Sequence, residues 1–165
     1  MAYPFKKIIW STEDSGKIPP SNEWLHSDEK EKLASFRFEK RREDWLLGRW
    51  TAKKVVRAFL ENDLPLSEIE IRKTESGAPE VYLANRPIDT TVSISHSQGT
   101  SFCVAGSRDM ALGCDLEYIE PRSSIFIEDY FTENEKFQLE KAISENYNSL
   151  INVIWSAKES TLKAM

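Results

Sequence analysis

The chain has 165 residues, of which 40% are apolar and 30% charged, and its formal net charge is −5. This length suits one mid-sized domain or two small related halves, and it lets about two-thirds of the unfolded surface become buried. The acidic balance argues against a broad nucleic-acid interface, which needs a cationic face. No apolar run approaches the roughly 20 residues that span a bilayer. The first ten residues do not resemble a signal peptide, so the cytoplasm is the expected location.

The first part of the chain predicts one strand followed by two helices. The strand covers Phe5–Trp10, and Ser27 is a candidate cap for a short helix that runs to about Ser35. The longest helical pattern covers Glu39–Glu61, where apolar residues recur at helical spacing along one face. The residues on that face are Trp45, Ala52, Val56 and Phe59.

The middle of the chain predicts short strands separated by turn-forming residues. They cover Glu68–Arg72, Glu80–Leu83, Thr91–Ser95, Ser101–Ser107 and Met110–Tyr118. Thr132 and Glu135 then form a capping-box pattern that opens a helix, and a last helix runs from about Asn148 to the end. Helices before and after a run of strands predict an α+β fold with a mainly antiparallel sheet. Cys103 and Cys114 lie in the strand-like runs and are expected to be buried, reduced thiols.

The run Gly113-Cys-Asp-Leu-Glu117 carries a candidate metal site. In a strand, Asp115 and Glu117 would project to the same face because they are two residues apart. Two adjacent carboxylates repel each other unless a cation, a proton or solvent relieves them, and Mg²⁺ suits such oxygen ligands. The alternative is a solvated strand face with two exposed acids, which this motif alone favours.

The run Trp155-Ser-Ala-Lys-Glu-Ser-Thr-Leu-Lys163 carries a second candidate. Trp155, Glu159 and Lys163 are four residues apart and would line one helix face. Glu159 could supply a third metal ligand or act as a general base. Lys163 could neutralise phosphate charge in a transition state. The alternative is an ordinary Glu–Lys helix pair, worth a few tenths of a kcal/mol.

Two further groups could bind an anion. The strand Thr91–Ser95 is expected to end so that Ser95 and His96 lie on a loop, where a hydroxyl and an imidazole can bind phosphate. An ordinary loop histidine is the alternative for His96. On the long helix, Arg49 and Lys53 are four apart and could reach one anion, but a basic surface ridge fits equally well.

The order of these motifs is more specific than any one of them. The stretches LLGRWTAKKVV, SISHSQG, LGCDLEYIEPR, FTENEKF and WSAKESTLKA follow one another between residues 46 and 164. In this order the chain resembles the 4'-phosphopantetheinyl transferase superfamily, and within it the Sfp-type enzymes of secondary metabolism. The resemblance implies two similar α/β halves with coenzyme A bound in the cleft between them. Residues 1–108 would form the N-terminal half, and residues 109–165 would begin a C-terminal half that carries the metal and catalytic motifs.

The resemblance also implies roles for the site residues. The positions that match Asp115, Glu117 and Glu159 hold Mg²⁺ against the coenzyme A pyrophosphate. Lys158 and Lys163 match positions that line the same site, and Lys163 is expected to contact the pyrophosphate. The positions that match Ser95 and His96 lie near the 3'-phosphate of the nucleotide. Arg49 and Lys53 match cofactor-binding positions less closely, and Arg49 is expected to assist nucleotide binding.

The reaction implied is transfer of 4'-phosphopantetheine from coenzyme A to a serine of an acyl or peptidyl carrier protein, with release of 3',5'-adenosine bisphosphate. A neutral serine hydroxyl is a poor nucleophile, so a base is needed. Glu159 is the first candidate for this base and Glu117 the second.

The chain departs from the family pattern in two places. It has Gly77-Ala78-Pro79 where many relatives have Gly-Lys-Pro. The family also continues past WSAKESTLKA with strands that complete the second half, so the sequence predicts an incomplete second half. The alternatives are a non-catalytic relative that binds coenzyme A or carrier protein without turnover, and an unrelated Mg²⁺-dependent phosphodiesterase that uses the same acids.

Overall fold

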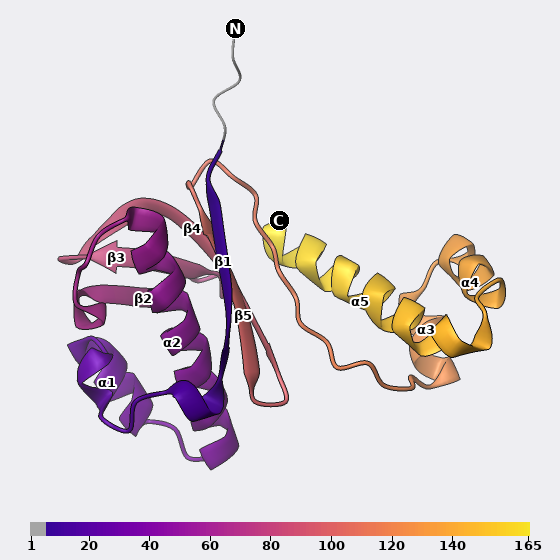
Figure 1. The fold of residues 1–165 in the computed structure, drawn as a ribbon, viewed down its shortest axis with the longest axis horizontal. Coiled ribbons are helices and arrows are strands. Elements are labelled where there is room, and N and C mark those ends of the chain that lie inside the picture. Colours follow the sequence, from indigo (N-terminus) through magenta and orange to yellow (C-terminus); the bar gives the residue numbers. More distant parts are fainter. Residues whose placement is uncertain (1–5) are drawn as a thin grey trace, which may run out of the picture.

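The computed structural model describes residues 6–165 of the chain (Figure 1). Its strands are β1 Ile8–Asp14, β2 Ile69–Lys73, β3 Pro79–Leu83, β4 Arg86–Ser97 and β5 Thr100–Gly106. Its α-helices are α1 Ser27–Ala34, α2 Glu39–Leu60, α3 Ser124–Tyr130, α4 Glu133–Glu140 and α5 Tyr147–Ala164. This order confirms the predicted α+β fold. The first predicted strand is shifted toward the C-terminus, and Phe5 lies outside the described residues.

The five strands form one antiparallel sheet in the order β1-β5-β4-β3-β2. Two-residue turns join β3 to β4 and β4 to β5. Ala84 and Asn85 have φ values of 48° and 61°, and Gln98 and Gly99 have φ values of 46° and 79°. Positive φ at both central residues matches the right-handed twist of a hairpin, and these turns therefore fix the pairing of the three strands.

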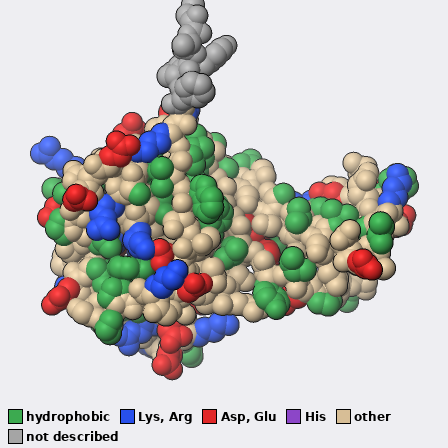
Figure 2. All heavy atoms as spheres, viewed as in Figure 1, with side chains coloured by type: hydrophobic (Ala, Val, Ile, Leu, Met, Phe, Trp, Pro, Cys, Tyr) green, Lys and Arg blue, Asp and Glu red, His purple; other side chains and the backbone are tan. Residues whose placement is uncertain are grey.

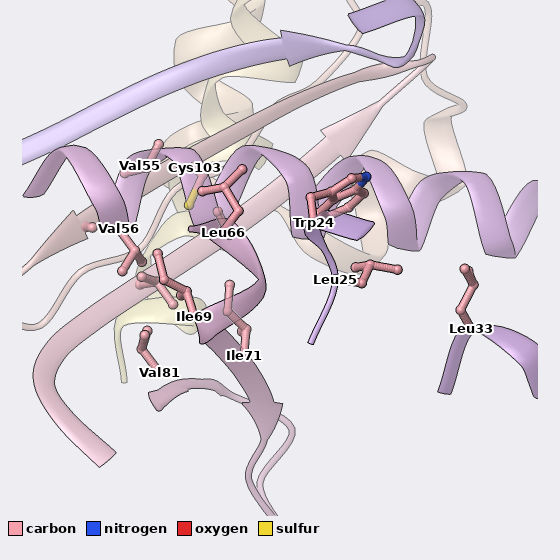
Figure 3. Packing of buried hydrophobic residues seen from close by; sticks show 13 residues of the cluster. Trp24, Leu25, Leu33, Val55, Val56, Leu66, Ile69, Ile71, Val81 and Cys103 are labelled. Atoms are coloured by element: carbon pink, nitrogen blue, oxygen red, sulfur yellow. The ribbon is translucent and has the colours of Figure 1, made fainter. Parts of the chain in front are cut away.

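Helix α2 covers one face of this sheet and forms the main core with it (Figures 1 and 3). Val55 and Val56 are buried on the helix and belong to one cluster with Ile69 and Val81 of the sheet. The apolar face expected for this helix is confirmed, since its four residues all belong to the cluster or pack against it. Helix α1 covers the β2 edge, where the Ile71 amide donates to Glu29 Oε1 at 3.1 Å. The side-chain cap of α1 is His26 rather than Ser27.

Residues 111–123 form no strand, although a strand was predicted over Met110–Tyr118. This segment reaches β4 with side-chain hydrogen bonds, not a ladder: the Cys114 amide donates to Ser93 Oγ at 3.0 Å, and the Cys114 thiol donates to the Ser93 carbonyl. It forms side-chain contacts with β4 and pairs with no strand of the sheet. The strand prediction is therefore wrong. Cys103 and Cys114 are both buried and free, as expected.

Helices α3, α4 and α5 have a second, smaller core and project away from the sheet (Figures 1 and 2). The predicted capping box at Thr132 and Glu135 is confirmed at the start of α4, whereas α3 was not predicted. On α5, Ile151 is fully buried, whereas Val153 is 62% exposed. Packing against α3 and α4 rotates the buried face of α5 toward Ile151. No helix in residues 6–165 is both long and apolar enough to cross a membrane.

Candidate functional site

Residues 111–123 lie so close to α5 that Gly113 leaves no room for a side chain. A Cβ atom at this position would fall 1.7 Å from the carbonyl oxygen of Ser160 and 3.0 Å from the amide nitrogen of Ala164. Glycine is therefore required by the close approach of the two backbones. The contact sets the positions of Asp115 and Glu117 beside the helix.

Asp115 lies where three parts of the chain meet. Its Oδ1 accepts hydrogen bonds from Lys163 Nζ of α5 at 2.6 Å and from Ser95 Oγ of β4 at 2.8 Å. Lys163 also donates to Ser95 Oγ at 3.1 Å, which closes a triangle of polar atoms. The Asp115 side chain is 5% exposed, and its second oxygen, Oδ2, is buried without a partner.

The charge state of Asp115 follows from these contacts. Burial raises the pKa of its carboxyl, but hydrogen bonds from Lys163 and Ser95 and the Lys163 charge lower it by more. The net result is a pKa below the usual range of an aspartate. Asp115 is thus a carboxylate at neutral pH, with one buried oxygen left over.

Glu117 is held by different partners, two residues further along. Its Oε1 accepts from the Trp155 indole Nε1 at 3.0 Å, and its Oε2 accepts from Arg122 Nη2 at 2.7 Å. Arg122 in turn donates to Asn152 of α5. Each of the two predicted metal ligands is therefore bound at one end of the same stretch of α5.

Glu159 lies on α5 between these two contacts, four residues from both Trp155 and Lys163. The alternative, a helix pair between Glu159 and Lys163, does not form, because Lys163 pairs with Asp115. The neighbouring Lys158 pairs with Glu135 at 2.8 Å. Glu159 instead lines a groove of about 690 Å³ between α3, α4 and α5. Tyr130, Trp155 and Leu162 form part of its apolar lining.

The three predicted metal ligands are not gathered around a single point. Within residues 6–165, the only three acidic or histidine side chains with ligand atoms all within 4.8 Å of one another are His26, Asp28 and Glu70. Arg72 already binds both oxygens of Glu70, at 2.7 and 2.6 Å. That second cluster is therefore occupied by a cationic side chain.

Ser95 and His96 face opposite sides of the sheet. The prediction that they lie on a loop is wrong, because β4 continues to Ser97 and alternate residues of a strand point to opposite faces. Ser95 joins Asp115 on one side. His96 lies on the α2 side, 4.0 Å from Asp44, and lines a cleft of about 660 Å³.

Arg49 also lines this cleft, and its side chain is mostly buried. Its guanidinium stacks over Trp45 at 5.0 Å and lies 3.7 Å from Glu29, and its buried Nε has no hydrogen-bond partner. Burial lowers the pKa of Arg49, and the Glu29 charge opposes this shift. The other cationic residues that line the cleft are Lys32, Arg41, Arg72 and Lys73.

Lys53 does not reach the cleft, although it is one helical turn from Arg49. Its side chain is fully buried and its ammonium binds Glu29 and the carbonyls of Trp24 and Leu66, the latter two at 3.1 Å. Burial lowers the pKa of Lys53, while Glu29 raises it. The reading of Arg49 and Lys53 as a surface ridge is therefore wrong. In this structure Lys53 contacts protein groups only.

Arg122 and Asn152 were not predicted as site residues. Arg122 binds Glu117 and Asn152 binds Arg122, yet neither has a residue type that marks a site by itself. The one available signal for Arg122 is its place at the end of the LGCDLEYIEPR stretch.

Comparison with known proteins gives a family match, a relative and similar solved structures. Residues 111–165 match the model of the 4'-phosphopantetheinyl transferase superfamily. A phosphopantetheinyl transferase from Thraustochytrium sp. is 34% identical over 110 residues, which cover 66% of this chain and 36% of that protein. The chain thus spans only about a third of the length of this relative.

Solved structures show the same fold. A holo-(acyl-carrier-protein) synthase from Bacillus anthracis, in complex with coenzyme A, has a TM-score of 0.53 and 18% identity, over 61% of this chain and 93% of that one. A holo-[acyl-carrier-protein] synthase from Thermotoga maritima has a TM-score of 0.50 and 16% identity, over 76% of this chain and 74% of that one. At these identities the likeness describes the fold alone.

Proposed function

Because the chain belongs to the 4'-phosphopantetheinyl transferase superfamily, we propose that it takes part in transfer of the 4'-phosphopantetheine group from coenzyme A to a serine of an acyl or peptidyl carrier protein. The reaction would depend on Mg²⁺ and release 3',5'-adenosine bisphosphate. The Bacillus anthracis synthase was solved with coenzyme A, which supports coenzyme A as the co-substrate. The Sfp type, a role in secondary metabolism and a cytoplasmic location stay predictions.

The observation that carries this proposal is the state of Asp115. Its carboxylate is buried, ionised and anchored through Oδ1, while Oδ2 has no partner. A buried anionic oxygen without a partner is costly unless a ligand or cation satisfies it. Oxygen donors of this kind suit Mg²⁺. The chemistry of the site therefore fits the predicted ion.

Asp115, Glu117 and Glu159 would hold the ion, and a bound Mg²⁺ would supply positive charge to the pyrophosphate of coenzyme A. Lys163 would add a second positive charge, since its ammonium binds Asp115 and its side chain is 31% exposed. Ser95 would orient both residues through its hydroxyl rather than bind the nucleotide. Glu159 would have to approach the other two acids when the ion binds, because their ligand atoms are not clustered in this structure.

Glu159 would also accept the proton of the carrier-protein serine. Neither neighbouring lysine neutralises it, since Lys158 and Lys163 pair with other acids. Glu117 is the second choice for this base, but both of its oxygens already accept hydrogen bonds. Lys158 would line the site only if it left Glu135.

The cleft on the α2 side of the sheet would bind the nucleotide of coenzyme A. His96 and Arg49 line it together with several other cationic side chains. Phosphate groups are bound well by such donors. We assign no nucleotide contact to Lys53, whose ammonium is bound within the core.

We further propose that residues 1–108 form the N-terminal half of the fold and that residues 109–165 begin the C-terminal half. The main core uses residues between Ile9 and Ala105, and the second core uses residues between Phe126 and Trp155. The two cores share no residue.

Intact-mass spectrometry of an apo carrier protein tests the transfer. The chain is incubated with coenzyme A and Mg²⁺, and a phosphopantetheine mass gain that EDTA abolishes is expected. Asp115→Ala should lose the product, and Arg108→Gln, which removes an exposed pair with Glu80, should keep it. Full activity of Asp115→Ala would remove the metal-site assignment.

The alternative is a relative that binds coenzyme A or carrier protein without turnover. The separation of the three acids favours it over an active metal site in this state. This alternative predicts that calorimetry detects binding of coenzyme A to the chain, while the carrier protein gains no mass. Hydrolysis of coenzyme A without a carrier protein would instead support a phosphodiesterase.

A further inference from the structure

One guanidinium, that of Arg122, ties residues 111–123 to α5. Its Nη2 donates to Glu117 Oε2 at 2.7 Å, and its Nε donates to Asn152 Oδ1 at 3.1 Å. Its Nη1 lies 3.2 Å from Glu120, and the ring of Phe126 lies 5.2 Å from the guanidinium carbon. The planar group is therefore fixed on several sides. A planar guanidinium held at its other nitrogens presents the remaining N–H to Glu117 in a fixed direction.

Asn152 anchors this arrangement to the helix. Asn152 is buried, with 2% of its surface exposed. Its Nδ2 donates to the carbonyls of Glu120 and Asn148, both at 2.8 Å. Because both amide protons are used, the amide oxygen must face Arg122. Arg122 thus binds an acceptor that cannot rotate away.

The held carboxylate is that of Glu117. It accepts one hydrogen bond on each oxygen, from Trp155 on α5 and from Arg122. The segment that carries Glu117 has no strand pairing, so side-chain contacts must fix its position. A carboxylate held on both oxygens cannot turn about its terminal bond, and each oxygen keeps a lone pair for a cation.

We propose that Arg122 is a positioning residue, which orients Glu117 as a ligand for the divalent cation through its anchor on Asn152. This inference rests on the proposed function, because it assumes that Glu117 binds a cation. Partners that orient metal ligands typically change metal affinity or activity about 10–100-fold when they are removed.

Charge alone predicts the opposite result. Loss of the positive charge of Arg122 would make the electrostatic potential at Glu117 more negative. This change would strengthen the binding of a cation. Weaker cation binding after its removal is therefore diagnostic of orientation. A purely structural ion pair would lower thermal stability and the fraction of folded protein, with the Mg²⁺ requirement of the folded fraction unchanged.

The test is a Mn²⁺ titration of the chain, followed by the electron paramagnetic resonance signal of the free ion, beside transfer assays at varied Mg²⁺. Arg122→Gln should weaken Mn²⁺ binding and raise the KM for Mg²⁺ by about 10–100-fold, while kcat at saturating Mg²⁺ is mostly kept. Arg122→Lys should recover part of the loss, because an ammonium can reach Glu117 but cannot also copy the fork.

Two variants serve as matched controls. Glu120→Gln removes the other acidic partner of Arg122 and leaves the bond to Glu117. Arg108→Gln removes an arginine–glutamate pair that includes neither Arg122 nor Glu117. Both should bind Mn²⁺ as the wild type does. Thermal unfolding of each variant establishes that it is folded at the assay temperature.

Unchanged or tighter Mn²⁺ binding by folded Arg122→Gln would overturn the positioning role. So would a loss of kcat with no change in the KM for Mg²⁺. If the wild type binds Mn²⁺ but makes no product, the proposed function falls, and the Mn²⁺ titrations still decide the role of Arg122. If the wild type binds no Mn²⁺, the inference falls as well.

Discussion

Lys163 and Asp115 are 48 residues apart in the chain, and their side chains form a 2.6 Å ion pair beneath α5. The lysine occupies one oxygen of the aspartate while the other oxygen stays buried and without a partner. The pair joins the last helix to the segment that carries the two predicted metal ligands. Its removal should therefore affect stability as well as activity.

Lys163→Met should destabilise the fold by about 1–3 kcal/mol, because it leaves the Asp115 carboxylate buried without its counter-charge. The double variant Asp115→Asn with Lys163→Met should lose less than the sum of the two single variants. Urea unfolding measures all four proteins. Lys6→Met is the control: its pair with Asp109 has the same 2.6 Å length, but both side chains are at least half exposed. Strict additivity of the two variants would contradict the coupling.

The stability of the protein should depend on Asp115 at acid pH. Its folded pKa is below the value of an unfolded aspartate, about 3.9. A depressed pKa contributes stability above the unfolded pKa, and this contribution is lost as pH falls through the lower folded pKa. The melting temperature of wild type should exceed that of Asp115→Asn at pH 7, and the difference should shrink as pH falls below about 4. A difference that does not vary with pH would contradict the depressed pKa.

Gly113→Ala should destabilise the protein by about 1–3 kcal/mol or more, because the new methyl group would overlap the backbone of α5. Gly16→Ala is a matched control, since a Cβ atom there meets nothing within 4 Å. Chemical denaturation of both variants gives the comparison. Equal stability of the two would mean that α5 can move away from residues 111–123 at little cost.

Ser95→Ala and His96→Ala should have different effects, although the residues are neighbours. Ser95→Ala removes a hydrogen bond from both Asp115 and Lys163, so it should raise the KM for Mg²⁺. His96→Ala changes the cleft on the other face, so it should raise the KM for coenzyme A by about tenfold, the value of one hydrogen bond to a charged group. Steady-state kinetics with each ligand varied separates them. The same kinetic change in both variants would argue against two separate sites.

Much of the fold could be predicted because its signals are local. The apolar spacing of α2 and the Thr132–Glu135 capping box lie within a few residues of the structure they specify. The run Met110–Tyr118 alternates as a strand does, but a strand also needs a free edge, and that depends on where the rest of the chain lies. Helix α3 has only seven residues, too few for a clear apolar period.

The candidate site was predictable in its residue types and less so in its contacts. Asp115, Glu117, Glu159 and Lys163 could be selected from motifs. The sequence could not show that Lys163 pairs with Asp115 instead of Glu159, because that choice depends on the close packing at Gly113. Likewise, Lys53 is buried and Arg49 lines the cleft because α1 brings Glu29 between them, a contact made across the fold.

Alternate side chains of β4 face two different sites: Ser95 contacts Asp115 on one face of the sheet, and His96 lines the cleft on the α2 face. A slip of β4 by a single residue would turn every side chain to the other face. Ser95 would then point toward α2, and His96 would meet Asp115 and Lys163. An insertion or deletion within this strand would thus damage both sites at once, even if every functional residue were kept. The tight turn at Gln98 and Gly99, which holds β4 to β5, is therefore as important to the chemistry as the residues that line either side.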